Sequence, residues 1–547
     1  MNIIIGNAWP YANGSLHIGH IAALLPGDVL ARYFRLKGDN VYFVSGSDCH
    51  GTPVTLRARQ ENSTPREVSD RYHDEFVDCF NHLGFTYDLY YKTSGEEHKS
   101  FVRDFHRKLY DGGYVYEKST PQAYCEKCAR FLPDRFVRGK CPHCGESARG
   151  DQCEACGNVL DPENLLDAKC SVCGQTPEFR PANHLFLAVT RLREQLDAYV
   201  ENHAGWRKNA YEMSKRYIHE GLRDRSLTRS LEWGIEVPRE GFEDKKIYIW
   251  AENVLGYLSC CHTLCKQQGL DFSEVWNSSR QYYVHGKDNI PFHTIILPSL
   301  LLGRSDVRLK LPDEIISSEY LTLEGKKIST SGNWAIWAKD ILDRYEPDSI
   351  RYFLTANGPE KRDTDFTWRE FVNSHNSELL GAYGNLVNRS LVFIRKSFGG
   401  KVPDGRYRPD IKGEIVSLYK NAGSLIGQGS VKEALEAVFA FVRSANKYFD
   451  EEQPWVTVRT DPEKCGDTLN TCVQIIANLS QLLDPFLPFS SKKVRDMLKL
   501  ADASWRYVEV PAGLELGPVE ILFGRIDKKA VAEEEARLGS ERHETPG

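Results

Sequence analysis

Apolar and polar positions divide the first fifty residues into a strand, a helix and a second strand. Asn2–Ala8 opens with three consecutive isoleucines, which predicts a buried β-strand. Ser15 is expected to cap a helix whose apolar residues recur at helical spacing to about Leu36. Asn40–Gly46 is again continuously apolar and predicts a second strand. Strand, helix and strand in this order predict a parallel sheet with its functional site at the carboxyl ends of the strands.

The pattern changes in the middle of the chain and then returns. From Gly113 to Pro181 the sequence is rich in glycine, cysteine and charge, with little periodicity. Such a segment predicts an insertion with too few apolar residues to hold a core without metal. Strand-like runs resume at Lys246–Trp250 and Gln281–His285, with helical stretches between and after them. We therefore expect the α/β sheet to continue after the insertion.

The last third of the chain predicts helices only. From about Asn373 to Gly524 apolar residues recur at intervals of three and four, most regularly in Val431–Phe449 and Thr468–Phe486. The acidic, polar tail from Ala530 is expected to form a frayed helix. A chain of 547 residues is too long for one hydrophobic core. The fold class is therefore α/β with an insertion, followed by an all-α domain.

Composition excludes a membrane protein and leaves a nucleic-acid partner open. Hydrophobic residues make up 41% and no apolar run reaches the roughly 18 residues needed to span a bilayer. The N-terminus resembles no leader, which predicts a cytoplasmic location. A net charge of −6 gives no sign of RNA binding, but basic residues gather in Lys215–Arg229 and Arg389–Lys412. Each cluster is either a solvated face or a local RNA contact.

Eight of the fifteen cysteines form four Cys-x-x-Cys pairs inside the insertion. The pairs are Cys125/Cys128, Cys141/Cys144, Cys153/Cys156 and Cys170/Cys173. Each pair places two thiolates on one tight turn, and two turns complete a tetrahedral site for Zn²⁺. Four cysteines leave no open position for a substrate, so both expected zinc ions are structural. Spacing alone does not decide which pairs share an ion.

A phosphate-handling motif is expected directly after the first strand. His17 and His20 flank Ile18-Gly19 in the first turns of the first helix, where free backbone N–H groups and the helix dipole favour phosphate. Residues three apart share a helix face, so both imidazoles could donate to one polyphosphate. The alternative is a pair of ordinary surface histidines.

His17-Ile18-Gly19-His20 and the later Lys327-Ile328-Ser329-Thr330-Ser331 resemble, in this order, the two signatures of class I aminoacyl-tRNA synthetases. Within that class the chain is similar to the methionyl-tRNA synthetases to about Asp527. Further matching segments are Pro10–Gly14, Asp48–Pro53, Trp250 with Gly256-Tyr257, Gly286–Asp288 and Phe292-His293. Thr330 stands where the second signature usually has a lysine, and Lys326 is the alternative cation.

The resemblance implies a methionine–tRNA ligase that forms methionyl-adenylate from ATP, releases pyrophosphate and transfers methionine to tRNA(Met). Catalysis then consists of positioning and charge stabilisation, with Mg²⁺ on the phosphates. The implied catalytic residues are His17, His20, Lys327 and Arg229. The implied ATP-binding residues are His17, Gly19, His20, Gly286, Asp288, Lys327 and Ser329, with Asp288 accepting from the ribose hydroxyls.

An aromatic pocket suits a flexible, polarizable thioether. By resemblance the methionine-binding residues are Trp9, Tyr11, Asp48, Trp250, Asn253, Val254, Tyr257, Phe292 and His293. Asp48 would bind the α-ammonium group. Asn253-Val254 stands where many bacterial members have Ala-Pro, and Trp9 replaces a smaller residue. Taken singly and without the resemblance, each aromatic residue is better explained by core packing.

The resemblance also implies the remaining sites. Asn385, Arg389 and Trp455 match the residues that read the anticodon, where an indole stacks on an unpaired base. The middle cysteine pairs would share one zinc and the outer pairs the other. The family's C-terminal dimerisation module is not found, which predicts a monomer.

The expected domains follow from both arguments. They are the first half of a Rossmann-type catalytic domain (1–116), a connective insertion (117–229, knuckles 125–173), the second half (230–320), a linker fold with the second signature (321–372), a helical anticodon-binding domain (373–527) and a polar tail (528–547). Two other functions are weighed against the ligase. One is a catalytically retired zinc-containing RNA-binding protein, and the other is a class I ligase for another small amino acid such as cysteine.

Overall fold

A five-stranded parallel sheet forms the centre of the molecule in the computed structural model, which describes residues 1–150, 153, 160–330 and 332–540. The strand order is β14-β13-β1-β2-β3, and every neighbouring pair is parallel. These strands span Asn2–Asn7 (β1), Asn40–Ser47 (β2), Leu89–Lys92 (β3), Arg280–Gly286 (β13) and Glu314–Ser318 (β14). The predicted α/β fold class is confirmed.

Helices cover the sheet and complete the α/β part. They are α1 (Ile18–Lys37), α2 (Thr52–Gln60), α3 (Pro65–His82), α4 (Glu96–Asp111), α5 (Arg193–Glu201), α6 (Lys208–Glu220), α7 (Ile249–Glu252), α8 (Gly256–Gln268), α9 (Phe272–Ser278), α10 (Leu297–Leu302), α11 (Ala338–Leu342) and α12 (Pro347–Ala356). A small sheet of β15 (Leu321–Leu323), β16 (Lys326–Lys327) and β17 (Thr364–Phe366) follows the main sheet.

Two local predictions were wrong. His17, not Ser15, caps α1, because its imidazole accepts from the Gly19 amide while His20 reaches back to the His17 amide. Of Lys246–Trp250, only β12 (Lys246–Ile247) is extended, and it pairs antiparallel with β11 (Thr228–Arg229) outside the main sheet. The chain then turns into α7, since a short apolar run does not distinguish a strand from a buried helical turn.

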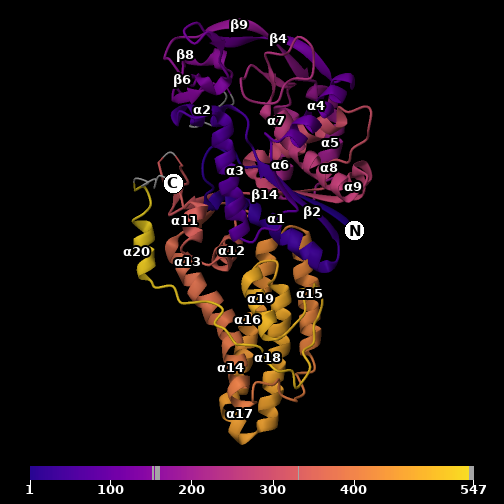
Figure 1. The fold of residues 1–547 in the computed structure, drawn as a ribbon, viewed down its shortest axis with the longest axis vertical. Helices are drawn as coiled ribbons and strands as arrows, with labels where there is room; N and C mark the ends of the chain where they lie inside the picture. The colour runs from indigo at the N-terminus through magenta and orange to yellow at the C-terminus, as the bar shows by residue number, and fades with distance from the viewer. Residues whose placement is uncertain (151–152, 154–159, 331, 541–547) are drawn as a thin grey trace.

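The insertion forms two small antiparallel sheets at one end of the molecule (Figure 1). One contains β4 (Val115–Cys125), β5 (Arg130–Phe131), β9 (Glu178–Leu187) and β10 (Arg225–Ser226). The other contains β6 (Val137–Lys140), β7 (Ser147–Arg149) and β8 (Leu166–Cys170). Its core combines buried Leu132, Phe136 and Val137 with cysteines. In this small core of the insertion, cysteine side chains thus occupy positions that apolar side chains fill in a larger core.

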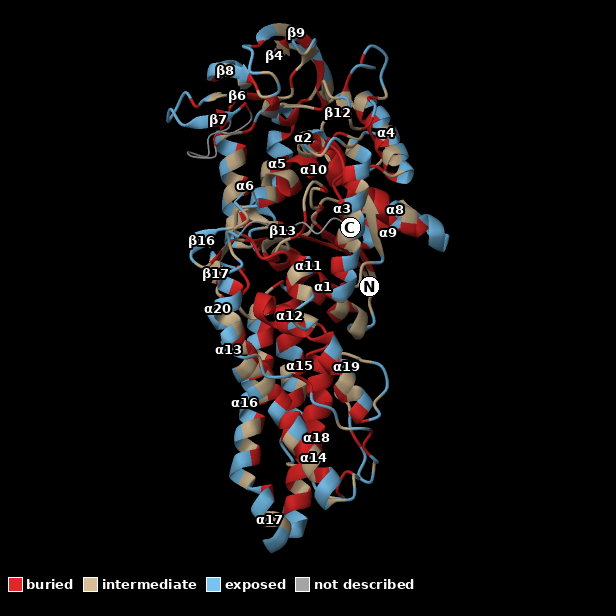
Figure 2. Ribbon diagram, turned by 60° about the vertical axis from the view of Figure 1, so that its left-hand side comes forward, coloured by how far each residue is buried: buried red, intermediate tan, exposed pale blue. Residues whose placement is uncertain are grey.

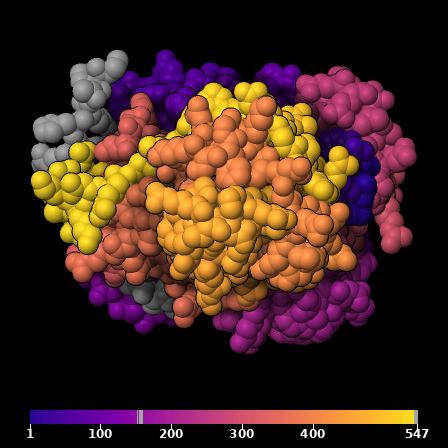
Figure 3. All heavy atoms as spheres, turned by 90° about the horizontal axis from the view of Figure 1, so that it is seen from below, coloured from indigo at the N-terminus to yellow at the C-terminus, as the bar shows by residue number. Residues whose placement is uncertain are grey.

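The opposite end is a helical bundle, and after Phe366 the described residues contain no strand. It consists of α13 (Trp368–Ser374), a π-helical segment (His375–Gly384), α14 (Asn385–Ser397), α15 (Ile411–Gly427), α16 (Val431–Glu452), α17 (Pro454–Thr460), α18 (Pro462–Leu482) and α19 (Pro488–Met497). Helix α18 runs through the middle, and its residues from Thr468 to Leu482 are buried (Figure 2). Seen from this end, the bundle occupies the centre of the surface (Figure 3).

The C-terminal segment returns along the bundle and docks where the bundle meets the catalytic part, against α13 and Arg344. Its helix α20 (Lys529–Glu535) packs against α13. Glu534 is buried and accepts hydrogen bonds of 2.6 and 2.9 Å from Arg344. The predicted frayed helix is therefore an anchored one over its described part. Within residues 1–150, 153, 160–330 and 332–540, no helix has the length and apolar character needed to cross a bilayer.

Candidate active site, cysteine clusters and anticodon end

A cavity of about 540 Å³ opens where the strand order reverses, between the carboxyl ends of β1 and β13. Chain segments leave these two strands in different directions, so a crevice forms between them. The expected site residues that line it are Trp9, Tyr11, His17, Gly19, His20, Trp250, Asn253, Tyr257, Gly286, Asp288, His293 and Lys327. Asp48, Arg229, Val254, Phe292 and Ser329 do not line it.

The two signature histidines form a stacked pair at the start of α1. Their ring centroids are 3.8 Å apart, and each Nδ1 accepts a backbone N–H, from Gly19 for His17 and from His17 for His20. Burial lowers the pKa of His20 to about 4, and burial with the neighbouring His20 holds the pKa of His17 well below its usual range. Both rings are therefore neutral near pH 7, with the proton on Nε2. That nitrogen is a hydrogen-bond donor, and both residues line the cavity.

The second signature lies opposite the histidines. Lys327 ends β16, is exposed and lines the cavity. A Cβ on Gly19 would lie 3.3 Å from the Ile328 side chain, so the glycine permits this close approach. Lys326 places its ammonium 4.4 Å from the centroid of the Trp334 ring. Ser331 lies outside the described residues, and the backbone of Ser329 pairs with that of Trp334.

One wall of the cavity is polar and was not foreseen from the sequence. Tyr320 donates to Asp288, and Lys287 forms ion pairs with Glu319 at 2.7 Å and Asp363 at 2.9 Å. Glu319, Tyr320 and Asp363 all line the cavity. Glu319 and Tyr320 directly follow β14, so the rule that sites gather at strand carboxyl ends could have located them.

The aromatic wall is tightly ordered. Tyr257 is 1% exposed and donates to His293 Nε2 at 2.8 Å, while His293 Nδ1 donates to the Asn289 carbonyl at 2.8 Å. Burial lowers the pKa of His293 to about 4, which fits this neutral tautomer. Phe292 stacks behind Trp250 with ring centroids 3.6 Å apart. It supports the wall without lining the cavity.

Trp9 is held between two glycines. A Cβ on Gly46 would lie 2.4 Å from its ring, and one on Gly256 would lie 2.6 Å from it. Asn253 lines the cavity, whereas Val254 is 1% exposed and belongs to the core of the α/β part. Of the two residues that differ from the common Ala-Pro pair, only Asn253 therefore faces the cavity.

Asp48 is buried just beyond the cavity wall. Burial and the nearby Glu252 raise its pKa well above the usual range, against hydrogen bonds from the His50 amide and the Asn253 side chain. Glu252 is itself fully buried and hydrogen-bonded to His50 Nδ1. The site thus holds two carboxyl groups in a space where only a cationic partner would favour their charged forms.

Arg229 lies farther away, on β11 near the insertion. Its guanidinium stacks over Tyr248 at 4.2 Å and lies 3.7 Å from a carboxylate oxygen of Asp134. The structure therefore does not bring Arg229 together with the signature histidines, and its phosphate role stays a prediction.

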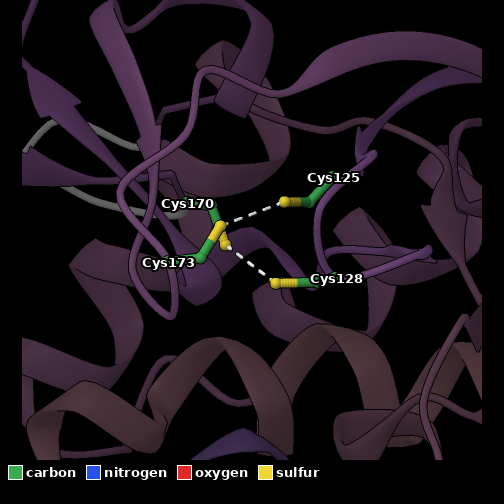
Figure 4. Close-up of side chains that lie close together, drawn as sticks. All are labelled: Cys125, Cys128, Cys170 and Cys173. Atoms are coloured by element: carbon green, nitrogen blue, oxygen red, sulfur yellow. Dashed lines mark hydrogen bonds between the residues drawn. The ribbon is translucent and has the colours of Figure 1, made fainter.

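The outer Cys-x-x-Cys pairs meet in one cluster. Cys125 and Cys128 face Cys170 and Cys173, with all four sulfurs within 4.8 Å of one another (Figure 4). Two Sγ–Sγ distances are 3.4 Å (Cys125–Cys173) and 3.9 Å (Cys128–Cys170). A tetrahedral zinc with Zn–S bonds of about 2.3 Å places its sulfurs about 3.8 Å apart. The donor set and spacing therefore fit Zn²⁺, and the sulfurs are too far apart for disulfide bonds.

The middle pairs form a second cluster. The sulfurs of Cys141, Cys144 and Cys153 lie within 4.8 Å of one another, and Cys144 and Cys153 are 3.6 Å apart. Cys156 lies outside the described residues. Among the described cysteines, the outer pairs therefore share one cluster, and the middle cysteines share another that lies between them in the sequence. This is the pairing that the resemblance implied and that spacing alone left open.

At the far tip of the bundle, two of the three expected anticodon residues converge on Phe449. Arg389 stacks over this ring at 4.1 Å and pairs with Asp450 at 2.7 Å. Trp455 is 48% exposed, with its ring centroid 6.1 Å from that of Phe449. Asn385 begins α14 one turn before Arg389 and is exposed. An exposed indole beside a guanidinium offers a surface on which an unpaired base can stack.

Comparisons with known proteins agree on both halves of the chain. Residues 3–391 match the family model for "tRNA synthetases class I (M)", and residues 410–543 match the "Anticodon binding domain of methionyl tRNA ligase". Among curated proteins, a methionine–tRNA ligase 1 from Alkaliphilus oremlandii is 51% identical over 98% of this chain and 100% of its own length. A methionine–tRNA ligase from Bacillus cereus is 52% identical over 98% of this chain and 99% of its own.

The fold also matches solved structures. The Mycobacterium tuberculosis methionyl-tRNA synthetase in complex with methionyl-adenylate aligns with a TM-score of 0.80. The alignment covers 96% of this chain and all of that one, at 22% identity. At this identity the likeness supports the fold alone.

Proposed function

The chain belongs to the methionine type of class I tRNA synthetases, and on this premise we propose how its residues carry out the reaction. It is an ATP-dependent methionine–tRNA ligase. In the first step a carboxylate oxygen of methionine attacks the α-phosphorus of ATP, and the bond to the bridging oxygen breaks to release pyrophosphate. In the second step a terminal ribose hydroxyl of tRNA(Met) attacks the activated carbonyl and releases AMP.

The single observation that carries the phosphate assignment is the fixed tautomer of two neutral histidines at one wall of the cavity. Because backbone N–H groups occupy each Nδ1, each Nε2–H is available to a phosphate oxygen. Lys327 supplies a full positive charge from the facing loop. A neutral donor on one side and a cation on the other stabilise charge that develops on the leaving pyrophosphate. Gly19 and Ser329 are assigned to the same nucleotide.

Magnesium bound to the phosphates would neutralise their charge and help to align them for in-line attack. We assign Gly286 and Asp288 to the ribose, and add Tyr320 as the residue that orients the Asp288 carboxylate. A role of Arg229 near the substrate carboxylate and phosphate is proposed on the resemblance alone, because Arg229 lies on β11 over Tyr248.

Methionine is assigned to the aromatic wall. Tyr11, Trp250, Tyr257 and His293 would surround the thioether, with Phe292 supporting Trp250 from behind. We propose that Asp48 becomes charged when the α-ammonium group binds, since an adjacent cation offsets the burial that favours its neutral form. Trp9 and Asn253 would shape the remaining wall, and Val254 would act only through packing.

Each cysteine cluster is proposed to hold one structural Zn²⁺, giving two ions per chain. The outer ion would be held by Cys125, Cys128, Cys170 and Cys173, and the inner ion by Cys141, Cys144, Cys153 and Cys156. The metal would supply folding energy to an insertion whose apolar core is small.

The helical end is proposed to read the anticodon of tRNA(Met) through Asn385, Arg389 and Trp455. We propose that the enzyme acts as a monomer in the cytoplasm, and that the domain bounds given from the sequence hold. The ligand-binding half and the RNA-reading half lie at different ends of an elongated molecule (Figure 1).

Pyrophosphate exchange tests this function directly. Purified protein is incubated with ATP, labelled pyrophosphate and each amino acid in turn, and exchange is expected with methionine above all others. Exchange with cysteine alone would identify the alternative ligase. No exchange with any amino acid, together with RNA binding, would indicate the retired RNA-binding protein.

A further inference from the structure

Glu252 is a buried acid without a role in the reaction steps above. It ends the short helix α7, is fully buried and does not line the substrate cavity. Trp250 in the same helix and Asn253 just after it do line the cavity. His106 fixes the helix from behind by donating to the Ala251 carbonyl at 2.9 Å. Glu252 therefore lies directly behind the wall against which methionine is expected to bind.

Glu252 is connected to Asp48 by two short routes. Glu252 Oε1 is hydrogen-bonded to Nδ1 of His50, which is buried, and the His50 amide donates to Asp48 Oδ1 at 3.4 Å. Asn253, the residue after Glu252, donates to Asp48 from its side chain. Because both routes end on the Asp48 carboxyl group, a change at Glu252 should alter the position of that group.

The two histidines beside Glu252 are neutral near pH 7. Burial lowers the pKa of His50 to about 3 and that of His98 to about 3. The Ser259 hydroxyl donates to the Gly256 carbonyl at 3.0 Å, so His98 Nδ1, 2.8 Å from Ser259 Oγ, donates to that oxygen. This leaves His98 Nε2 as an acceptor, 4.0 Å from Glu252 Oε1. An acceptor at this place disfavours a negative charge on the Glu252 oxygen.

No cation lies close enough to balance a charge on Glu252. Within the described residues, its ion-pair partners up to 4.0 Å are the two neighbouring histidines. Other titratable side chains around this network are Asp48, Arg66, Lys99, His106, Glu236 and Lys246. Lys99 and Lys246 already pair with Glu96 at 3.0 Å and Glu236 at 3.3 Å. Burial raises the pKa of Glu252 well above its usual range, Lys99 opposes this effect and Glu236 adds to it.

A neutral Glu252 changes what Asp48 can do. Methionine brings a single α-ammonium group, and two neighbouring buried carboxylates would repel each other. Burial and the nearby Glu252 raise the pKa of Asp48. If Glu252 keeps its proton, this repulsion is absent when Asp48 loses its own proton to solvent. One cation then pairs with one anion.

We propose that Glu252 is a positioning residue for methionine recognition, an acid that stays protonated, holds His50 and thereby aims Asp48 at the α-ammonium group. The proposal rests on the proposed function, in which Asp48 binds that group. Glu252 touches no substrate and acts through His50 and Asn253.

The variants Glu252→Gln and Glu252→Leu test both parts of the proposal. Glutamine is neutral, has a similar shape and can still bond to His50, so the KM for methionine in pyrophosphate exchange should stay within about threefold of the parent. Leucine cannot bond to His50, so this KM should rise at least about tenfold while the KM for ATP changes less than about twofold. A Glu252→Gln variant as impaired as Glu252→Leu would overturn the protonated state. A parental KM in Glu252→Leu would overturn the positioning role.

Two substrate analogues locate the effect at the ammonium group. Methioninol keeps this group and lacks the carboxylate, whereas 4-(methylthio)butanoate lacks the amine. Glu252→Leu should weaken inhibition by methioninol at least about tenfold, and inhibition by 4-(methylthio)butanoate less than about threefold. Gln281→Leu is the matched control, because it also removes a fully buried polar side chain, near the amino end of β13 and away from the cavity. It should affect both inhibitors equally. Equal weakening of both by Glu252→Leu would show general damage to the wall and contradict the proposal.

A double-variant cycle tests whether Glu252 acts through His50. His50→Leu should raise the KM for methionine as Glu252→Leu does, and the double variant should be no worse than the more impaired single variant, since both changes remove the same contact. Multiplied effects in the double variant would show that the two residues act independently.

The charge state of Glu252 is measured with the conservative variant, so it is decided even if Glu252→Leu does not fold. The infrared difference spectrum between the parent and Glu252→Gln should show the C=O stretch of a protonated carboxyl group. The KM for methionine should fall as the pH rises through the range in which free Asp48 loses its proton, with the same midpoint in both proteins. Carboxylate bands, or a shifted midpoint in Glu252→Gln, would overturn the proposal. If the parent shows no methionine-dependent exchange, the proposed function has failed, and the infrared spectrum still reports the state of Glu252.

Discussion

A missing Cβ at Gly256 decides how closely Trp9 can approach helix α8. An alanine there would place its Cβ 2.6 Å from the indole, well inside van der Waals contact, and Gly46 blocks the opposite side. The indole is 6% exposed and forms part of the cavity wall. The identity of one residue on a helix thereby sets the shape of the cavity wall.

Gly256→Ala should therefore raise the KM for methionine at least tenfold while the KM for ATP changes less than twofold. Overpacking of this kind costs about 1–3 kcal/mol. Pyrophosphate exchange at varied methionine and varied ATP gives both constants. Gly413→Ala is the matched control, because an added Cβ at Gly413 on α15 meets no atom within 4 Å. Equal effects on the two substrates would show that the damage is general.

His20→Ala and Lys327→Ala should each lower the rate of adenylate formation by roughly 10²–10³, the usual effect of removing one charge-stabilising donor. The dissociation constant for methionine should hardly change, because neither side chain belongs to the aromatic wall. Lys140→Ala is the control, since Lys140 is exposed on β6 of the insertion and does not line the cavity. Exchange within threefold of the parent for both variants would contradict the phosphate assignment.

Asn253 is the residue most expected to affect inhibitors shaped for the commoner Ala-Pro wall. Its amide lines the cavity and would clash or lose its hydrogen bond to Asp48, at a cost of about 1–3 kcal/mol. Such rigid methionine mimics should inhibit charging by the parent protein at least tenfold more weakly than charging by the Asn253→Ala variant. Val254→Pro alone should have little effect, because Val254 does not line the cavity. Equal inhibition of parent and Asn253→Ala would show that this wall does not restrict entry.

At the scale of elements, the insertion has a small apolar core that includes the clustered cysteines. Each proposed zinc joins turns that are distant in the sequence, and the outer cluster joins β4 to β8. Loss of a thiolate should therefore disorder the insertion before the sheet, whose strands are buried independently of the metal.

Cys141→Ser should lower the zinc content from two ions to about one and increase proteolysis within the insertion. Elemental analysis and limited proteolysis of metal-replete protein measure both. Cys79→Ser is the control, because Cys79 is buried in the core of the α/β part, away from both clusters. One ion or none in the parent protein would reject the two-zinc assignment.

At the scale of the whole molecule, the cavity lies at the central sheet, and the expected anticodon residues lie at the far tip of the helical bundle near α17 (Figure 1). Trp455→Ala should leave pyrophosphate exchange unchanged and lower the charging of tRNA(Met) at least tenfold. The loss of one stacked base costs about 1–3 kcal/mol. Val456→Ala, the next residue and 43% exposed, is the matched control for apolar surface at the tip. Equal loss of exchange and charging by Trp455→Ala would indicate a packing role.

The sequence alone determined the fold class, the position of the signatures and the presence of the Cys-x-x-Cys turns. These features depend on local patterns: apolar runs produce β1 and β2, a glycine-flanked helix start follows the first strand, and Cys-x-x-Cys forms within one turn. Family resemblance added the expected roles of residues that no local pattern distinguishes.

Only the tertiary structure decided which distant residues share a surface. Lys246–Trp250 has a strand's composition but only two extended residues, because its register partner is the short β11 and not the central sheet. Glu319, Tyr320 and Asp363 join the cavity, and Asp48 and Val254 stand behind its wall, because side-chain direction depends on packing across elements. The pairing of the cysteine turns and the hydrogen bond between His50 and Glu252 are likewise contacts between segments separated in the chain, which sequence spacing does not specify.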